Sequence, residues 1–252
     1  MATYFLAKSR STAISGLEIA GLLGTKIITP RTFLTRVIYG DTIINWGRSF
    51  PVADDVTQAL RWLNPTRAAA VSSNKLKTLQ YLRAREIAAL EFTTDKEVAV
   101  GWGCRVFARH LLRGAGGRGI DIVLPDEPMP DAPLYTKGFP KDREYRVHAG
   151  RGQAFFIQQK RLVREERRPL GHTPGIRNYA NGWIFACKDI DDPPEGIEDL
   201  AARAVAACGL DFGAVDVLVD KNNNAVVCEV NSAPGVDGST VDAYVSFFRS
   251  IL

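Results

Sequence analysis

Three side chains near the C-terminal end of the sequence could hold a divalent cation. Asp216 precedes a polar turn, and Glu229 and Asn231 follow the turn two residues apart. Carboxylate and amide oxygens are the ligands that Mg²⁺ prefers, especially where nucleotide phosphates complete its octahedral shell. The alternative is a surface hairpin whose acidic side chains are simply solvated.

Two short strands must position these oxygens. The alternation of apolar residues predicts strands at Ala214–Val219 and Ala225–Val230, joined by a turn at Asp220–Asn224. Asn and Asp supply the backbone conformations that a tight hairpin turn needs. Because successive side chains of a strand point to opposite faces, an antiparallel pairing would gather the three oxygen ligands on one face.

A basic residue opens a predicted helix in the middle of the chain. The sequence NKLKTLQYLRAR predicts a helix at Asn74–Arg85, which places Lys75 in its first turn. The helix dipole does not favour a cation there. Lys75 is therefore either directed at an anion or a solvated surface lysine.

A glycine-rich loop follows a predicted strand that carries Arg109. The strand covers Arg105–Leu111, the loop reads GAGGRG over residues 114–119, and a second strand covers Ile120–Leu124. Such a loop can fold its amides over phosphate oxygens, although a flexible hairpin turn is the alternative. The GxxxxGK[ST] pattern is absent and no helix follows, which excludes a P-loop and a Rossmann fingerprint.

Further ionisable groups alternate along the next predicted strands. Glu144, Arg146 and His148 share one strand face, which fits the floor of a polar cleft or the exposed face of an antiparallel sheet. A strand at Gln153–Leu162 carries Lys160 near its end. The polar stretch at 164–180, which contains Arg177, is expected to be a long loop, either disordered or functional.

The first 66 residues predict a small α/β unit. A strand is expected at Thr3–Ala7 and a helix at Asp55–Leu63, with Asn64-Pro65 closing the unit. Trp46, in the loop Asn45–Ser49, is either a packed anchor or a ligand contact.

Composition bounds the class of protein. The chain has 252 residues, 46% of them hydrophobic and 24% charged, and a formal net charge of +4, which is typical of a globular protein and does not by itself indicate nucleic acid. No apolar run is long enough to span a membrane, and we expect no secretory signal. The cysteines lack metal-type spacing and predict reduced thiols in a cytoplasmic protein: Cys104, Cys187, Cys208 and Cys228.

The ordered set of these motifs is more specific than any one of them. Across residues 67–252 it resembles the ATP-grasp superfamily, most closely small phage-type ATP-grasp proteins and the glutamate-ligase branch. The resemblance implies an α+β fold in which two subdomains clasp ATP. It implies a reduced N-terminal α/β domain at 1–66, an ATP-grasp domain at 67–252, and a glycine-loop lid at 94–135.

The resemblance also implies roles for individual residues. The residues expected to bind ATP are Lys75, Arg109 (where the family usually has lysine), Gly114, Gly116, Gly117, Gly119, the hinge Tyr135, Thr136 and Lys137, and the ribose-binding Glu144. Those expected to face the transferred phosphoryl group are Arg146, Lys160 and Arg177. Those expected to bind Mg²⁺ are Asp216, Glu229 and Asn231.

The activity that the resemblance implies is an ATP- and Mg²⁺-dependent carboxylate–amine ligase that acts through an acyl-phosphate. The amine acceptor is a small molecule or a peptide, and His148 or Asp237 is the candidate for assisting its deprotonation. The alternatives are an ATP-grasp phosphotransferase and a nucleotide-binding module without turnover. Whether the chain forms a homo-oligomer stays open.

Overall fold

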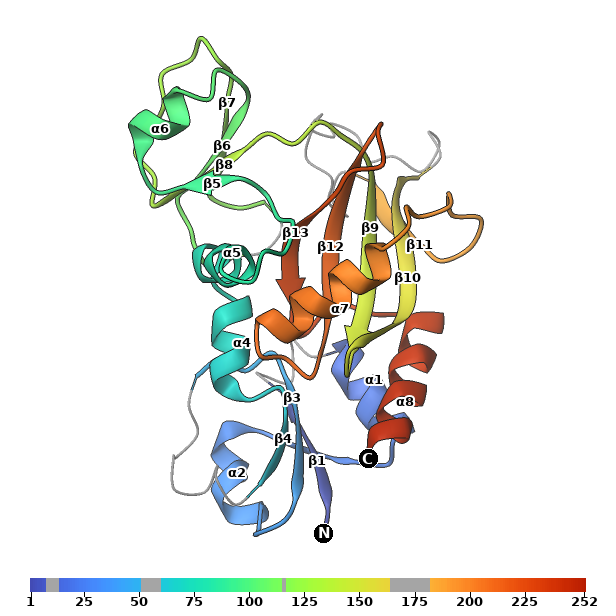
Figure 1. Cartoon of the computed structure of the whole chain (residues 1–252). Helices are drawn as coiled ribbons and strands as arrows, with labels where there is room; N and C mark the ends of the chain where they lie inside the picture. Colours follow the sequence, from blue (N-terminus) through green and yellow to red (C-terminus); the bar gives the residue numbers. More distant parts are fainter. Residues whose placement is uncertain (8–13, 51–59, 115–116, 164–181) are drawn as a thin grey trace.

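A computed structural model describes residues 1–7, 14–50, 60–114, 117–163 and 182–252. Three sheets run through this part of the chain (Figure 1): a parallel N-terminal sheet, a small antiparallel sheet, and a five-stranded antiparallel sheet between them. None of the described helices is long and apolar enough to cross a membrane. The mixed α+β character predicted from the sequence is confirmed.

The N-terminal sheet is parallel throughout, in the order β2-β1-β3-β4. Its strands and associated helices are β1 (Thr3–Ala7), α1 (Ile14–Leu22), β2 (Lys26–Ile28), α2 (Pro30–Arg36), β3 (Thr42–Trp46) and β4 (Arg61–Leu63). The strand predicted at Thr3–Ala7 is confirmed. The helix predicted at Asp55–Leu63 is wrong at its end, because Arg61–Leu63 pairs with β3 as a strand; residues 55–59 lie outside the described residues.

The small antiparallel sheet, which we call the lid, has the order β5-β8-β6-β7. Its elements are β5 (Phe92–Thr93), α6 (Lys96–Val100), β6 (Val106–Arg109), β7 (Ile120–Val123) and β8 (Leu134–Lys137). The Asp95 side chain caps α6 by accepting hydrogen bonds from two backbone amides. Val106 and Ala108 of β6 face the lid core, so Phe107 and Arg109 face the other way.

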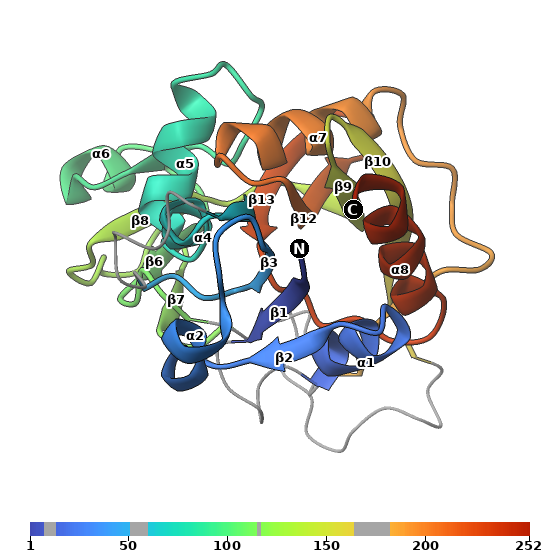
Figure 2. The same cartoon turned by 90° about the horizontal axis from the view of Figure 1, so that it is seen from below.

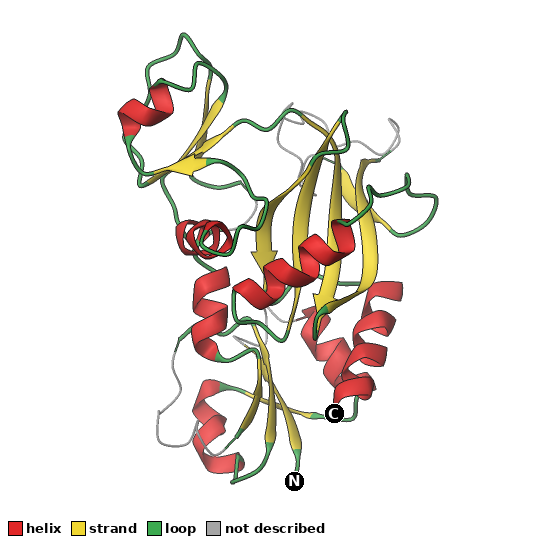
Figure 3. Ribbon diagram, viewed as in Figure 1, coloured by secondary structure: helices red, strands yellow, loops and turns green. Residues whose placement is uncertain are grey.

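The central sheet has the order β11-β10-β9-β12-β13 and is antiparallel throughout. Its strands are β9 (Lys141–Gly150), β10 (Gln153–Leu162), β11 (Trp183–Ala186), β12 (Phe212–Asp220) and β13 (Ala225–Asn231). Helix α7 (Ile197–Ala207) covers one face (Figure 3), packing on apolar residues such as Tyr145 and Val217. The hairpin predicted near the C-terminus is confirmed.

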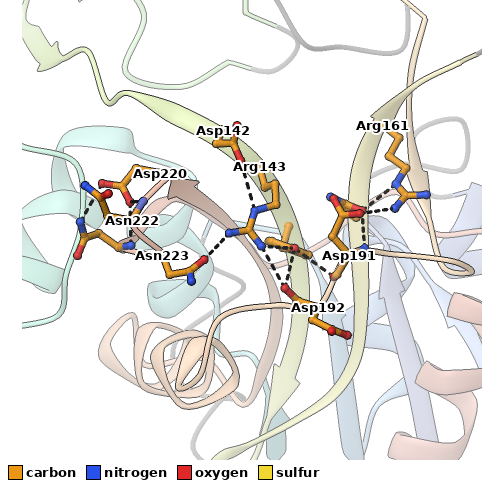
Figure 4. Close-up of polar contacts among 11 residues, drawn as sticks. Asp142, Arg143, Arg161, Asp191, Asp192, Asp220, Asn222 and Asn223 are labelled. Carbon is orange, nitrogen blue, oxygen red and sulfur yellow. Dashed lines mark hydrogen bonds and ion pairs between the residues drawn. The ribbon is translucent and has the colours of Figure 1, made fainter.

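Polar contacts on the α7 side tie the connection between β11 and α7 to the sheet (Figure 4). The Tyr145 hydroxyl donates to the Asp191 carbonyl (3.1 Å), and Arg143 Nη1 donates to the Asp192 carbonyl (3.1 Å). Arg161 lies 3.1 Å from the Asp191 carboxylate. Since side chains alternate along a strand, the neighbours of these residues on β9 and β10 face the opposite side of the sheet.

The N-terminal sheet shares its core with the C-terminal helix α8 (Ser239–Ile251), which lies beside α1 (Figure 2). Trp46 stacks on Phe212 and contacts Tyr244 edge-on, so it is a packed anchor. The buried Asn64 side chain accepts hydrogen bonds from the backbone of Asp211 and Phe212. Helices α4 (Thr66–Ser72) and α5 (Lys75–Arg83) then lead into the lid. The boundaries predicted at 66, 94 and 135 stay predictions.

Candidate active site

A cavity of about 1170 Å³ lies between the lid and the face of the central sheet that α7 leaves open. The lid contributes Phe107, Arg109 and Lys137 to its wall, and the central sheet contributes most of its floor. This volume is of the size that small-molecule and cofactor sites have in proteins. The cavity is therefore the first place to look for the predicted site residues.

Four polar side chains form one row across the floor of the cavity. Asp216 on β12 lies opposite Glu229 on β13 and, on its other side, opposite Arg146 on β9. Arg146 in turn lies opposite Gln158 on β10. All four line the cavity, so the register of four strands places two acids, a cation and an amide in one line.

Arg146 and Asp216 form the strongest contact in this row. The guanidinium donates two hydrogen bonds to the carboxylate, at 2.7 and 2.9 Å, and its carbon lies 3.9 Å from the centre of the Phe185 ring. Burial opposes the charged form of Asp216, but the Arg146 charge outweighs it and holds the pKa of Asp216 below its usual range. Both groups are therefore ionised at neutral pH.

A second row crosses the floor on the side of the hinge between the sheet and the lid. Lys160 Nζ lies 2.7 Å and Lys141 Nζ lies 3.2 Å from the two oxygens of the buried Glu144 carboxylate. Phe185, opposite Lys160 on β11, places its ring 5.1 Å from the ammonium. The row thus holds two cations around one acid, beside an aromatic ring that attracts cations.

Lys75 joins the first row from the start of α5. Its Nζ lies 3.3 Å from Glu229 Oε1 and donates to the Gly114 carbonyl, also at 3.3 Å. The helix that was predicted is confirmed, with Asn74 as its N-cap. The choice left open for Lys75 is thus decided in favour of an anion, because its ammonium is directed at a carboxylate and a backbone oxygen of the glycine loop.

The glycine loop lies over the same end of the cavity. Gly117 lines the cavity, and Gly117 and Gly119 both have positive φ angles, of 78° and 66°, which favour glycine. At Gly119 a Cβ would also lie 2.8 Å from the Leu111 side chain. Gly116 and Arg177 lie outside the described residues.

Of the three predicted hinge residues, Lys137 lines the cavity, whereas Tyr135 and Thr136 do not. Lys137 lines the cavity and pairs with Glu91 at 2.9 Å. Tyr135 packs in the lid core, and Thr136 is fully buried and accepts a hydrogen bond at 3.2 Å from Arg109 Nε. The Tyr135 side chain therefore turns away from the cavity, and Thr136 contributes by orienting Arg109.

The oxygen ligands of the first row fit a magnesium ion in type and position. Asp216 and Glu229 are partners across β12 and β13, and Asn231 lies on the same strand face as Glu229. The described residues hold no group of three or more His, Cys, Asp or Glu side chains that could bind a metal. A cation would therefore take two carboxylates and an amide oxygen from the protein and its remaining ligands from a substrate, as Mg²⁺ commonly does.

His148 does not fit a role as a base. Its side chain is fully buried, it lies outside the cavity lining, and its two ring nitrogens bind Tyr244 and Gln158. Burial lowers its pKa to about 4. Asp237, the other candidate, does line the cavity.

Sequence reasoning did not single out several cavity residues. Gln158 and Lys141 follow from strand alternation alone, whereas Phe185 and Trp183 carried no signal beyond their apolar strand. The cavity residues that were not predicted include Arg105, Phe107, Phe139, Lys141, Gln158, Trp183, Phe185, Leu218 and Cys228.

Comparisons with known proteins identify the fold. The RimK-like ATP-grasp domain family matches residues 187–251. The ATP-grasp ligase PsnB in complex with a minimal precursor superposes with a TM-score of 0.67 at 12% identity, covering 98% of this chain and 99% of that chain. D-alanine–D-alanine ligase from Bacillus anthracis does so with a TM-score of 0.70 at 14% identity, covering 100% and 93%.

The chain has the ATP-grasp fold. This confirms the resemblance inferred from the ordered motifs, and it extends to the N-terminal unit because the superpositions cover nearly the whole chain. An N5-carboxyaminoimidazole synthase from Aspergillus clavatus, bound to ADP, is also similar, with a TM-score of 0.61 at 15% identity over 92% of this chain and 69% of that chain. Among curated protein sequences, none matches the chain.

Proposed function

We propose that this ATP-grasp protein is an ATP- and Mg²⁺-dependent ligase that joins a carboxylate to an amine. The observation that carries the proposal is the first row, in which the acids Asp216 and Glu229 lie in register with Arg146 beneath a lid that presents Arg109. Phosphoryl transfer depends mainly on positioning and on neutralising negative charge, and this arrangement supplies both.

The nucleotide would lie between lid and sheet, with its phosphates toward Lys75 and the glycine loop. Glu144 is the candidate for binding the ribose hydroxyls, since its buried carboxylate lies in the second row and lines the cavity. Bound by Asp216, Glu229 and Asn231, Mg²⁺ would supply charge neutralisation at the phosphates. Similar solved proteins support the nucleotide: PsnB has been solved with Mg and ADP, and the Bacillus anthracis ligase with ATP.

The reaction proceeds in two steps. A carboxylate oxygen of the substrate attacks the γ-phosphorus, and the bond from that phosphorus to the ADP oxygen breaks. The amine nitrogen then attacks the acyl carbon, the carbon–oxygen bond to phosphate breaks, and the amine proton passes to a base or to solvent. Arg146 and Lys160 would stabilise the charge on the transferred group, and a closed lid would keep water from the acyl-phosphate. Asp237 is the candidate base.

The acceptor is proposed to be a peptide. Ile14 and Ile184 line the cavity and stay 76% and 40% exposed, so the cavity opens onto an apolar rim that a chain could cover. PsnB has been solved in complex with a precursor peptide, whereas the similar protein from Bacillus anthracis is a D-alanine–D-alanine ligase.

An ADP-release screen with free amino acids and peptides, followed by mass spectrometry of the products, tests the proposal. We expect ADP release that requires Mg²⁺ and a carboxylate–amine pair, with an amide product, and its loss in Glu229→Gln. A phosphorylated product without an amide would favour the phosphotransferase. Turnover of amino acids alone would exclude the peptide acceptor, and unchanged turnover in Glu229→Gln would exclude the metal site.

A further inference from the structure

A chain of three buried polar side chains runs from α8 into the floor of the cavity. The Tyr244 hydroxyl lies 3.0 Å from His148 Nδ1, and His148 Nε2 lies 2.9 Å from Gln158 Oε1. Tyr244 and His148 are fully buried and Gln158 is 3% exposed. Only Gln158 of the three lines the cavity. The chain therefore connects the core to a single cavity residue.

The protons in this chain have one consistent arrangement. A neutral imidazole carries one N–H, and a carbonyl oxygen only accepts. His148 Nε2–H therefore donates to Gln158 Oε1, and the Tyr244 hydroxyl donates to Nδ1. In the opposite arrangement the phenol would accept from Nδ1–H, and its own proton would meet no acceptor among the residues that the structure describes.

This arrangement fixes the direction of the Gln158 amide. Its oxygen is bound to His148, so its nitrogen points away, toward Cys187 Sγ at 3.8 Å. Sulfur is a weak acceptor. Gln158 itself lines the cavity, so this cavity residue carries an amide donor whose contact in the described part of the chain is a weak one to sulfur.

The position of Gln158 relates it to the first row. Gln158 lies opposite Arg146, at the end of the row away from Glu229. Its strand is two strand spacings from the strand of Asp216, a distance of about 10 Å. Arg146 is bound to Asp216, and the Gln158 amide adds an uncharged donor beyond it at this end of the row. A donor here can bind an oxygen of a group that lies beyond the phosphates.

We propose that Gln158 binds the carboxylate substrate by donating an amide hydrogen to one of its oxygens, and that His148 and Tyr244 are positioning residues that hold the amide in this direction. This rests on the proposed ligase function, because it assigns the residue that would orient the carboxylate for attack on ATP. An apolar residue or a carboxylate at position 158 would lack the donor, whereas the amide can accept from His148 and donate to the substrate at the same time.

The orientation is tested first in the protein without ligands, by ¹⁵N NMR of the His148 ring at pH 7. We expect a neutral ring protonated at Nε2, and Tyr244→Phe should allow the Nδ1–H tautomer. A ring protonated at Nδ1 in the wild type would overturn the orientation. This readout does not depend on any activity, so it is separate from the proposed function.

The binding role is tested with N-acetyl-L-glutamate as a carboxylate probe in the presence of Mg²⁺ and ADP. We expect the NMR signals of the Gln158 side-chain amide to shift when the probe is titrated in. Gln158→Met and Gln158→Glu should each lower the affinity for the probe about 10- to 100-fold, while the affinity for ADP stays within about twofold of the wild type. Gln159→Met is the matched control, because that neighbouring amide faces the other side of the sheet and binds Asp191.

The role of Gln158 would be overturned by amide signals that do not shift with the probe, or by equal probe affinity in wild type and Gln158→Met. A loss of ADP affinity that matches the loss of probe affinity would also overturn it, because the residue would then serve the nucleotide. Failure of ADP to bind the wild type would instead contradict the proposed function.

Discussion

Acid should destabilise this protein through one buried imidazole. His148 is fully buried, and burial lowers its pKa to about 4 although its hydrogen bond to Gln158 works in the opposite direction. In the unfolded chain the same imidazole titrates near 6.5. As the pH falls below about 6.5, the imidazole therefore becomes protonated in the unfolded state while it stays neutral in the folded state. The free energy of unfolding decreases as a result.

The size of this effect follows from the two pKa values. The difference between 6.5 and about 4 corresponds to about 3 kcal/mol once the pH has fallen through the folded value, and to about 2 kcal/mol between pH 7 and pH 5. The charged and titratable groups that act on the ring are Arg146, Asp216 and Tyr244. Arg146 adds to the depression and Asp216 opposes it, so their mutual ion pair keeps the net influence small.

Urea denaturation at pH 7 and pH 5 measures this directly when the wild type is compared with His148→Gln. The glutamine can still bind Tyr244 and Gln158 but does not titrate. We expect the wild type to lose about 2 kcal/mol more than the variant between the two pH values. The carboxylates contribute equally to both proteins, so their effect cancels. Equal losses in the two proteins would refute the assignment of His148 as a buried neutral ring.

Two further perturbations test the packing and the charges of the site. Asp216→Ala leaves the Arg146 guanidinium buried without its partner and should lower the free energy of unfolding, measured by urea denaturation, by about 3–5 kcal/mol. Asp216→Leu combined with Arg146→Met removes both charges and should lower it clearly less. Equal losses in the two variants would contradict the pairing. Gly150→Ala places a Cβ against the Phe247 ring and should lower the free energy of unfolding by about 1–3 kcal/mol. Gly21→Ala in α1 is the control: its Cβ would meet nothing within 4 Å, so this substitution should not destabilise the protein.

Local patterns were enough to predict most of the elements. The strands at Thr3–Ala7 and Gln153–Leu162 and the C-terminal hairpin are confirmed because apolar alternation and turn residues lie close in sequence. The three-residue spacing of Leu60 and Leu63 predicts a helix that ends at Leu63. In the structure Arg61–Leu63 is a strand, because it pairs with β3, which is distant in sequence. Such non-local pairing leaves no local signature.

The same limit applies to the cavity. Alternation placed Glu144, Arg146 and His148 on one face, and the structure agrees. Alternation alone could not show which end of this strand face is buried and which is open. Helix α8 decides this, because it covers His148 and leaves Arg146 in the cavity. Gln158 was missed for a related reason: its amide acquires a direction only through Tyr244 and His148, which join it from two other elements.

Binding of a non-hydrolysable ATP analogue, with and without Mg²⁺, tests the central claim most directly. Isothermal titration of AMPPNP should give binding to the wild type that strengthens when Mg²⁺ is present, and Glu229→Gln should lose that strengthening while binding the analogue without Mg²⁺ much as before, since Glu229 lies at the metal-binding end of the first row. Analogue binding that ignores both Mg²⁺ and Glu229→Gln would contradict the account.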